Sequence, residues 1–256
     1  MKNGVREGHF AKKQIFCKDR LISWSHRRRF EVGLSLARQF AGKRILDYGC
    51  GDGTFLAMLM ADSVAPSEAV GCDLHVNLVE DCRTRLGNGR GLGFVLDNEL
   101  ETPDHLYSYD AVICMEVLEH VVDVGPVLDR FVRLLAPSGK LIISVPVETG
   151  LPLIVKQAVR RIAGLRGIGD YPGTSSYSLE EFWVSVFAGC TQHIVRPIHG
   201  DGDGGHFHDH KGFNWLVLRD ALSERFHIER TVCSPLTWLP PGLSSQVWFL
   251  GCKKPG

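Results

Sequence analysis

Short apolar segments alternate with helix-like segments between residues 44 and 146, and this alternation restricts the fold more than any other feature of the chain. The apolar segments lie at residues 44–48, 69–73, 92–97, 109–115 and 139–146. Segments with helical periodicity lie between them, at 54–61, 76–86 and 124–135. The apolar runs are nearly continuous, which is typical of strands covered on both faces. The pattern therefore predicts an α/β fold with a doubly wound parallel sheet.

The same alternation is interrupted after Pro146. The later elements are expected as helices at 151–165, 178–188 and 212–225 and strands at 226–233 and 245–252. A helix from the N-cap Ser25 to about Ala41 is expected before the first strand. We therefore predict one domain over residues 25–256, with an inserted helical cap at 147–205 and a basic N-terminal arm at 1–24.

Composition excludes several classes of protein. The chain has 256 residues, of which 44% are hydrophobic, so it can build one sizeable core. Lys+Arg and Asp+Glu are both 29, which gives no overall attraction to nucleic acid or membrane. No apolar run reaches the roughly 18 residues of a spanning helix, and the N-terminus lacks the apolar segment of a secretory signal. The eight cysteines form no C-x-x-C pair and are expected to be reduced core thiols of a cytoplasmic protein.

The stretch "ILDYGCGDGTFL", residues 45–56, carries the first sign of a ligand. Gly49 and Gly51 allow the backbone to turn tightly and to approach a ligand closely. The dinucleotide pattern G-x-G-x-x-G fails because Thr54 stands at its sixth position. Asp47 also disfavours a pyrophosphate, since both would be negative. A carboxylate at this place favours a cationic ligand, such as the sulfonium and ammonium groups of S-adenosylmethionine.

Polar side chains follow the next strands in a consistent way. Asp73 closes the second strand and is expected to accept hydrogen bonds from ribose hydroxyls. Asp97 closes the third strand, with Asn98 beside it, and is expected to accept from an adenine amino group. Glu116 follows the fourth strand. The neighbouring apolar residues expected at the cofactor are Leu74 and Met115.

The segments "ILDYGCGDGTFL", "AVGCDLH", "FVLDNELE", "YDAVICMEVLEHV" and "LLAPSGKLIISVP" resemble the class I S-adenosylmethionine-dependent methyltransferases of type 11/23. The resemblance covers residues 25–146 and extends distantly to ubiquinone-pathway O-methyltransferases. It implies a Rossmann-like, seven-stranded sheet whose last strand is antiparallel. It also implies that Asp47, Gly49 and Gly51 contact the methionine moiety, Asp73 the ribose and Asp97 the adenine.

The turn "MEVLEHV" supplies the candidate catalytic residues Glu116, Glu119 and His120, spaced for one face of a helical turn. Three readings stay open. His120 is a general base that takes a hydroxyl proton. Alternatively, the three residues hold a divalent metal, as similar E-x-x-E-H turns do in metal-dependent O-methyltransferases. In the third reading, they only cap a helix and shape the cofactor pocket.

A second histidine cluster, "GGHFHDHKGF", contains His206, His208, Asp209 and His210. It is one residue short of the H-x-H-x-D-H spacing of zinc hydrolases, which argues against that class. We expect this loop to reach over the active site, so that one histidine contacts the acceptor or a metal. A solvated polar loop is the alternative.

The segment 151–166 predicts an amphipathic helix. Its apolar stripe comprises Leu151, Ile154, Val155, Ala158, Val159, Ile162 and Leu165. Lys156 and Arg160 lie opposite this stripe. One reading is a lid that packs its stripe over the acceptor pocket. The other is a basic helix that lies on an anionic membrane surface.

The sequence as a whole predicts a methyltransferase that acts on a small or lipid-like acceptor, with oxygen favoured as the acceptor atom. Residues 97–123 carry many acids and no Lys or Arg, which disfavours a nucleic-acid acceptor, although "HRRR" at 26–29 points the other way. The alternatives are an RNA methyltransferase, a non-catalytic cofactor-binding relative, and a nucleotide-sugar or NAD-dependent enzyme of the same fold.

Overall fold

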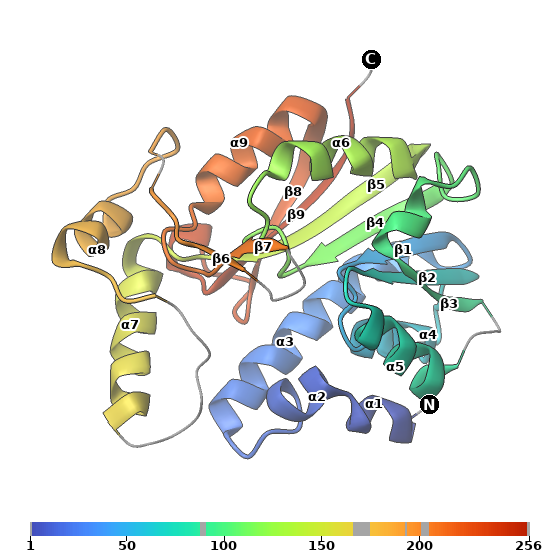
Figure 1. The fold of residues 1–256 in the computed structure, drawn as a ribbon, viewed down its shortest axis with the longest axis horizontal. Coiled ribbons are helices and arrows are strands. Elements are labelled where there is room, and N and C mark those ends of the chain that lie inside the picture. Colours follow the sequence, from blue (N-terminus) through green and yellow to red (C-terminus); the bar gives the residue numbers. More distant parts are fainter. Residues whose placement is uncertain (1, 88–90, 166–174, 193, 201–204, 255–256) are drawn as a thin grey trace.

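A computed structural model describes residues 2–87, 91–165, 175–192, 194–200 and 205–254 (Figure 1). Its centre is a seven-stranded sheet in the order β3-β2-β1-β4-β5-β9-β8. The strands are β1 Arg44–Tyr48, β2 Glu68–Asp73, β3 Leu92–Leu96, β4 Tyr109–Met115, β5 Leu135–Pro146, β8 Phe226–Ser234 and β9 Gln246–Lys253. The first five strands pair in parallel, and β9 runs antiparallel to both β5 and β8. The predicted Rossmann-like sheet with an antiparallel last strand is confirmed.

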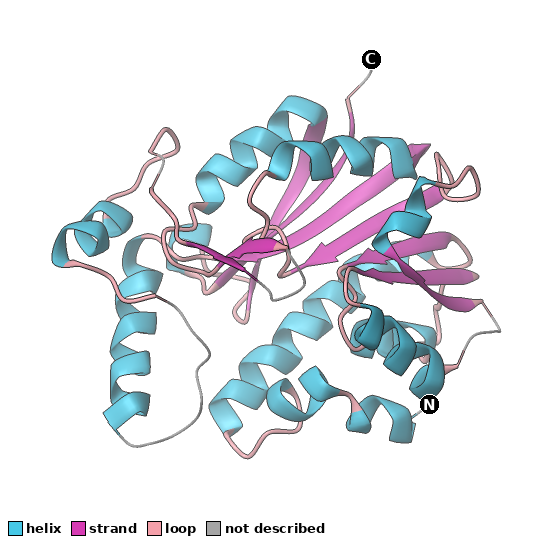
Figure 2. Ribbon diagram, in the orientation of Figure 1, coloured by secondary structure: helices cyan, strands magenta, loops and turns pink. Residues whose placement is uncertain are grey.

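Helices cover both faces of this sheet (Figure 2). They are α3 Arg20–Ala37, α4 Thr54–Met60, α5 Val76–Leu86, α6 Val124–Leu134 and α9 Trp215–Arg225. One hydrophobic cluster joins α6 and α9 to the sheet through Phe131 and Leu222. A second cluster joins α3, α4 and α5 to the opposite face through Phe30, Leu56 and Val79. Burial on both faces explains why β1 and β4 read as continuous apolar runs.

The start of the chain differs from the prediction. Helix α3 begins at Arg20, because the Asp19 carboxylate accepts hydrogen bonds from the backbone N–H groups of Leu21 and Ile22, each at 2.9 Å. Ser25 lies inside this helix, so its predicted role as N-cap is wrong. The expected surface arm forms α1 Lys2–Glu7 and α2 His9–Gln14, and Ala11 of α2 is buried.

Two other boundaries also differ from the expectation. Helix α6 ends at Leu134, since β5 already begins at Leu135 and runs through Pro137. Helix α9 begins at Trp215, where Asn214 acts as N-cap and its side chain accepts from the N–H of Leu216 at 3.1 Å. The remaining short elements are the 3-10 helices η1 Arg38–Phe40, η2 Asp97–Glu101 and η3 Pro241–Leu243.

The segment predicted as a cap contains α7 Gly150–Leu165 and α8 Leu179–Val186. It ends in the short strand β6 Ile198–Gly200, which pairs antiparallel with β7 His206–His208. In Figure 1, α7 and α8 stand away from the covered sheet, whereas β6 and β7 lie close to the ends of the central strands. Residues 166–174 and the side chains of 162–165 lie outside the described residues. The division into a domain and a cap stays a prediction.

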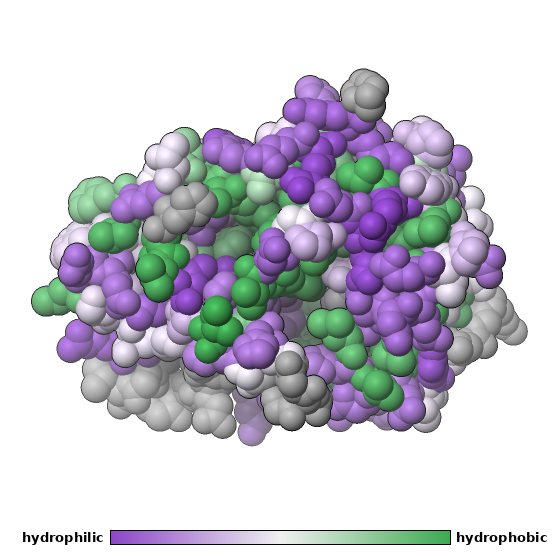
Figure 3. All heavy atoms as spheres, turned by 45° about the horizontal axis from the view of Figure 1, so that its top comes forward, coloured by the Kyte–Doolittle hydropathy of each residue, from purple (hydrophilic) through white to green (hydrophobic). Residues whose placement is uncertain are grey.

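The molecular surface mixes polar and apolar side chains. In the space-filling view, apolar side chains gather around a hollow on the left of the face shown (Figure 3). On α8, large apolar residues are exposed at one-turn spacing, namely Leu179, Trp183 and Phe187. None of the helices in the described part of the chain is long and apolar enough to span a bilayer.

Candidate functional site

The glycine-rich loop follows β1 at the carboxyl edge of the sheet. Gly49 and Gly51 both have left-handed backbone, with φ of 74° and 55°. A Cβ at Gly49 would lie 2.3 Å from Cγ2 of Val117, and one at Gly51 would lie 3.2 Å from the ring of Phe10. The loop is therefore approached closely by the β4 turn on one side and by α2 on the other. A larger residue at Gly49 would displace Val117.

Asp47 is the most unusual group in this loop region. Its side chain is 1% exposed, and its Oδ2 atom has no hydrogen-bond partner among the described residues. Burial, and then the neighbouring carboxylates of Asp73 and Asp52, raises the pKa of Asp47 to about 8. An unpartnered buried carboxyl of this kind fits a cationic ligand, which would stabilise its ionised form.

Asp73 lies at the end of β2 and holds the loop in place. Its Oδ2 accepts from the N–H of Gly51 at 3.0 Å, and its Oδ1 accepts from the N–H of His75 at 3.1 Å. Each carboxylate oxygen can accept a further hydrogen bond, so these contacts leave room for ribose hydroxyls. Leu74, which follows Asp73, is 72% exposed and is available for contact with a ligand.

Asp97 has a strong partner that the sequence analysis missed. The guanidinium of Arg130 on α6 donates to both carboxylate oxygens, at 2.7 and 2.6 Å, and also pairs with Glu101 at 2.7 Å. The predicted contact of Asp97 with adenine stays a prediction and would have to share this carboxylate with Arg130. Asn98 beside it is exposed, and Met115 at the end of β4 is half-buried.

A hollow of about 630 Å³ lies between the N-terminal helices and the start of α5. Its walls include Phe10, Lys12 and Lys13 on one side and His75 and Asp81 on the other. Because β2 leads into His75, this hollow is on the β2 side of the glycine loop, away from the β4 turn. Its position suits the adenosine end of a ligand better than the reacting end.

Glu116, the first residue of the β4 turn, is fully engaged by the protein. Its backbone is left-handed, with φ of 57°, which is strained for a non-glycine residue. Oε1 accepts from Ser144 Oγ at 3.1 Å and Oε2 accepts from Gln246 Nε2 at 2.9 Å. Arg29 of α3 forms an ion pair with Oε2 at 3.4 Å. The predicted grouping of Glu116 with Glu119 and His120 as metal ligands is therefore not what the structure brings together.

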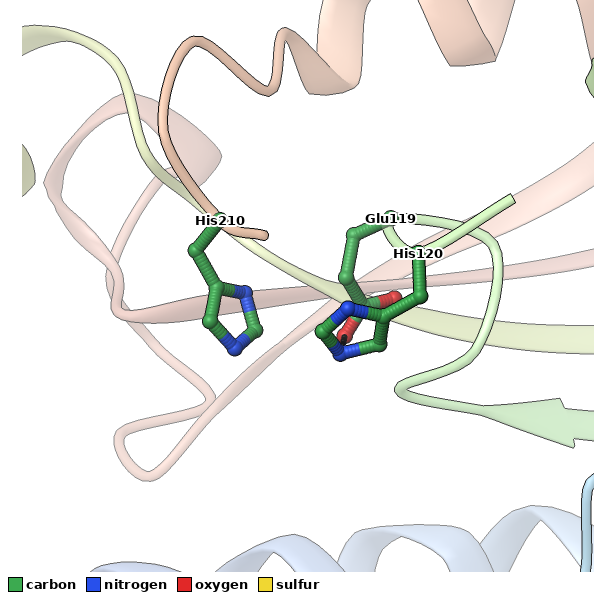
Figure 4. A group of neighbouring side chains, drawn as sticks. All are labelled: Glu119, His120 and His210. Atoms are coloured by element: carbon green, nitrogen blue, oxygen red, sulfur yellow. Dashed lines mark ion pairs between the residues drawn. The ribbon is translucent and has the colours of Figure 1, made fainter. Parts of the chain in front are cut away.

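The structure instead brings Glu119 and His120 together with His210 (Figure 4). One potential ligand atom from each residue lies within 4.8 Å of the others. Glu119 is fully buried, and neither of its carboxylate oxygens has a hydrogen-bond partner among the described residues. Burial, and then the nearby Glu116 carboxylate, raises the pKa of Glu119 well above its usual range.

His120 is oriented by the loop that follows β7. Its Nδ1 lies 2.8 Å from the carbonyl oxygen of His208. A carbonyl can only accept, so Nδ1 carries the proton, and in the neutral ring the free lone pair is on Nε2. That Nε2 atom lies 3.9 Å from Oε1 of Glu119. The imidazole is thus held with its basic nitrogen toward the buried carboxyl.

His210 completes the group from the same loop. Its ring centre is 4.8 Å from that of His120, and burial together with His120 lowers the pKa of His210 to about 4. The loop reaches the "MEVLEHV" turn, since the N–H of His208 also donates to the carbonyl of His120 at 2.9 Å. The expectation that one of its histidines contacts the acceptor or a metal stays a prediction. His206 is exposed and takes no part in the group.

Three further residues near this turn were missed because they are distant in sequence. Arg196 donates to the carbonyl of Glu119, and burial lowers the pKa of this guanidinium to about 10. On α3, burial and the neighbouring Arg29 lower the pKa of His26 to about 4. The run "HRRR" was the available signal, but its histidine and last arginine face Glu116 within the protein, and Arg29 forms an ion pair with it.

Comparisons with known proteins agree with this geometry. A family model described as "Methyltransferase domain" matches residues 23–193. Ubiquinone biosynthesis O-methyltransferases from Xanthomonas oryzae and Klebsiella pneumoniae are each 35% identical, over 43% and 60% of this chain. These matches cover 46% and 64% of the two relatives, so the chain spans about half to two thirds of their length.

A solved structure gives the same fold at lower identity. An S-adenosylmethionine-dependent methyltransferase from Mesorhizobium loti has a TM-score of 0.53 and 15% identity, with 89% of this chain and 98% of that one covered. The family match extends over most of the chain, and the central sheet has the strand order β3-β2-β1-β4-β5-β9-β8. The chain belongs to the class I S-adenosylmethionine-dependent methyltransferases.

Proposed function

We propose that this methyltransferase transfers the methyl group to a hydroxyl oxygen of a small or lipid-like molecule. The observation that carries the proposal is the buried Glu119, unpartnered and adjacent to His120 and His210. A hydroxyl is a weak nucleophile unless its proton is removed, so O-methylation calls for a proton acceptor at the reacting atom. The ubiquinone-pathway names of the relatives support oxygen as the acceptor atom.

The cofactor half of the site binds S-adenosylmethionine and orients its methyl group. When bound, S-adenosylmethionine supplies an electrophilic methyl group on a sulfonium. Asp47 offers its unpartnered carboxylate oxygen to the positive charge, while Asp73 fixes the glycine loop through Gly51. In-line transfer requires the reacting oxygen and the methyl carbon to be held about 3–3.5 Å apart.

The acceptor half of the site removes the proton. His120 Nε2 takes the proton of the acceptor hydroxyl as the new O–C bond forms and the C–S bond breaks. The His208 carbonyl keeps the proton of the imidazole on Nδ1, so Nε2 stays basic. The imidazolium that results lies beside the buried Glu119 carboxyl and favours its ionised form, as Arg29 and Arg196 also do.

The same residues also fit a divalent cation. Glu119, His120 and His210 would hold it through one carboxylate oxygen and two imidazole nitrogens, a donor set that suits Mn, Fe, Co or Zn better than Mg or Ca. Such an ion would lower the pKa of a bound hydroxyl. Glu116, whose two oxygens are already engaged, would support the turn and not bind the ion.

A panel of catechols and simple phenols tests the proposal through release of S-adenosylhomocysteine and identification of the O-methylated product. His120→Gln is expected to lower kcat about 100-fold or more with unchanged affinity for S-adenosylmethionine. His206→Ala, an exposed residue of the neighbouring loop, is the matched control and keeps parent activity. Full activity of His120→Gln, or methylation at nitrogen or carbon only, would refute the proposal.

Removal of metal separates the two mechanisms. If an ion is held, EDTA abolishes turnover, and Mn²⁺ or Zn²⁺ restores it in the parent but not in His210→Ala. If His120 acts without a metal, EDTA leaves turnover unchanged, while His120→Gln still lowers kcat.

A further inference from the structure

Two cationic residues of α7, Lys156 and Arg160, point toward the strand ends, whereas Arg161 is exposed. Lys156 Nζ lies 2.9 Å from Glu148 Oε1 and 3.1 Å from the carbonyl of Ser245, and Arg160 Nη2 lies 3.3 Å from the same Glu148 oxygen. Glu148, which follows β5, is 1% exposed. Leu151, Val155 and Val159 of the predicted apolar stripe are exposed, so the reading of α7 as a lid that packs this stripe over the acceptor pocket is wrong. Contact of α7 with a membrane stays a prediction.

This buried group is incomplete in both charge and hydrogen bonding. Among the described residues, two cations pair with one carboxylate, which leaves one positive charge in excess there. Both cations share Oε1 of Glu148, while its Oε2 has no partner among the described residues. Arg160 Nη1 is likewise buried without a partner there. Unpaired buried polar groups destabilise a fold, and charged ones more than neutral ones, so a fold retains them where a ligand completes them.

The group lies next to the proposed reacting residues. Glu148 and Lys156 are close enough to His210 that their charges act on its pKa in opposite directions. The two strands that lead here, β4 with its turn and β5 with Glu148, are neighbours in the sheet. A molecule whose hydroxyl lies at His120 can therefore place a second polar group beneath α7.

We propose that Arg160 and Lys156 form an oxyanion subsite for the methyl acceptor, so that the acceptor is a hydroxy acid. The oxyanion accepts from Arg160 Nη1 and is attracted by the excess positive charge. Glu148 Oε2 accepts from a hydroxyl donor on the same molecule. This inference rests on the proposed function, since it assigns the class of acceptor for that reaction.

Binding to the full-length protein saturated with S-adenosylhomocysteine tests the subsite without turnover. The probes are 3,4-dihydroxybenzoate, catechol, which lacks only the carboxylate, and inorganic phosphate. We expect titration calorimetry to show 3,4-dihydroxybenzoate binding about tenfold or more tightly than catechol. The ratio should fall to about one or two in Arg160→Met and persist in Arg161→Met, an exposed neighbour on the same helix.

Two variants guard against a purely structural effect. Arg160→Lys keeps the charge but loses the Nη1 donor and should retain part of the preference. If Arg160→Met does not fold, as judged by thermal melting, Lys156→Gln takes its place with the same expected loss. Phosphate that binds more tightly than 3,4-dihydroxybenzoate, in an Arg160-dependent way, would identify a phosphorylated acceptor and not a carboxylate.

Three results would overturn the subsite. They are equal affinity for 3,4-dihydroxybenzoate and catechol, binding of none of the probes, and a preference that survives in Arg160→Met. The last two would mean that the ion group serves only to fasten α7 to the sheet. Methyl transfer is measured separately with the same phenols. Arg160-dependent binding without O-methylation would refute the proposed function and leave the oxyanion subsite standing.

Discussion

Helices α6 and α7 flank the same strand, β5, and both are amphipathic in sequence, yet they bury opposite faces. On α6, the apolar residues Leu128, Phe131 and Leu134 are completely buried against the sheet. On α7, Leu151, Val155 and Val159 are 58%, 61% and 44% exposed. The charged Lys156 and Arg160 of α7 face inward, as does Leu153 near its start.

The difference lies in what each helix covers. Helix α6 covers the apolar middle of the sheet, where burial of apolar surface stabilises the fold. Helix α7 lies beyond the carboxyl end of β5, where Glu148 provides a buried charge to pair with. An amphipathic pattern thus identifies a helix and its two faces, but the surroundings decide which face turns inward. A buried charge at the strand ends marks the functional end of the sheet.

The largest expected effect is on the free energy of unfolding, which a substitution on the buried face of α6 should lower far more than one on the exposed face of α7. Phe131→Ala on α6 should cost about 3–5 kcal/mol of unfolding free energy, because it leaves a cavity in a fully buried cluster. For a chain of this length that lowers Tm by about 10 °C. Val159→Ser on the outer face of α7 should stay within about 0.5 kcal/mol of the parent. Thermal and urea unfolding of both variants measure this, and an equal loss in Val159→Ser would mean that its face is covered in solution.

The same contrast explains how far the sequence alone could go. Most boundaries of the seven central strands and of helices α4, α5 and α6 were predicted to within one residue, since each depends on local periodicity and on burial against one continuous sheet. The exceptions are the start of β5, which is Leu135 instead of residue 139, and the strands β6 and β7, which were not predicted. Asp47 and Asp73 were found because a polar residue at the end of an apolar strand has a fixed place in this fold.

The remaining details depend on contacts distant in sequence. Ser25 was chosen as N-cap by type, but Asp19 begins the helix one and a half turns earlier with two hydrogen bonds. Arg130 reaches Asp97 across the top of the sheet, and His210 reaches His120 from a loop far along the chain. The hydrophobic periodicity of a sequence does not predict contacts between residues so far apart in the chain. The inward orientation of the charged face of α7 was not predicted, because Glu148 was not considered as a buried charge that could pair with it.

A second prediction concerns Asp47, whose replacement should have opposite effects on cofactor binding and on the stability of the empty protein. Asp47→Asn should weaken S-adenosylmethionine binding about 100-fold, or about 2.7 kcal/mol, because the positive ligand loses its buried counter-charge. The same change should stabilise the empty protein. The folded pKa of about 8 lies above the unfolded value of about 3.9, so the contribution of Asp47 to stability is present below pH 4 and is lost between about pH 4 and 8.

Two measurements check this prediction. Near pH 8 the Tm of Asp47→Asn without ligand should exceed that of the parent by several degrees, and the difference should vanish near pH 4. At pH 7 the empty parent holds the proton on Asp47, so ligand binding should release about one proton per site, seen by calorimetry in buffers of different ionisation enthalpy. Binding without proton release in the parent would contradict the role of Asp47.

The smallest expected effect concerns helix α2, which covers the carboxyl ends of the strands at the glycine loop, away from α7. Helix α2 lies over the glycine loop through Phe10, whose ring approaches Gly51, and through the N–H of Ala11, which donates to Asp52 Oδ2 at 2.9 Å. Helix α2 thus places an apolar ring against the glycine loop, whereas α7 places charged side chains against Glu148. Phe10→Ala should therefore weaken S-adenosylmethionine binding about fivefold, or about 1 kcal/mol, by loss of apolar contact.

Helices α2 and α7 are expected to affect the binding of different ligands. Phe10→Ala should leave the preference for 3,4-dihydroxybenzoate over catechol unchanged, while Arg160→Met should leave the affinity for S-adenosylmethionine unchanged. Phe16→Ala is a control for Phe10, because Phe16 is equally exposed but lies beyond α2. Titration of each variant with both ligands measures the separation. A loss of both affinities in either variant would mean that the N-terminal helices and α7 close over one shared cavity, so that cofactor and acceptor binding are coupled.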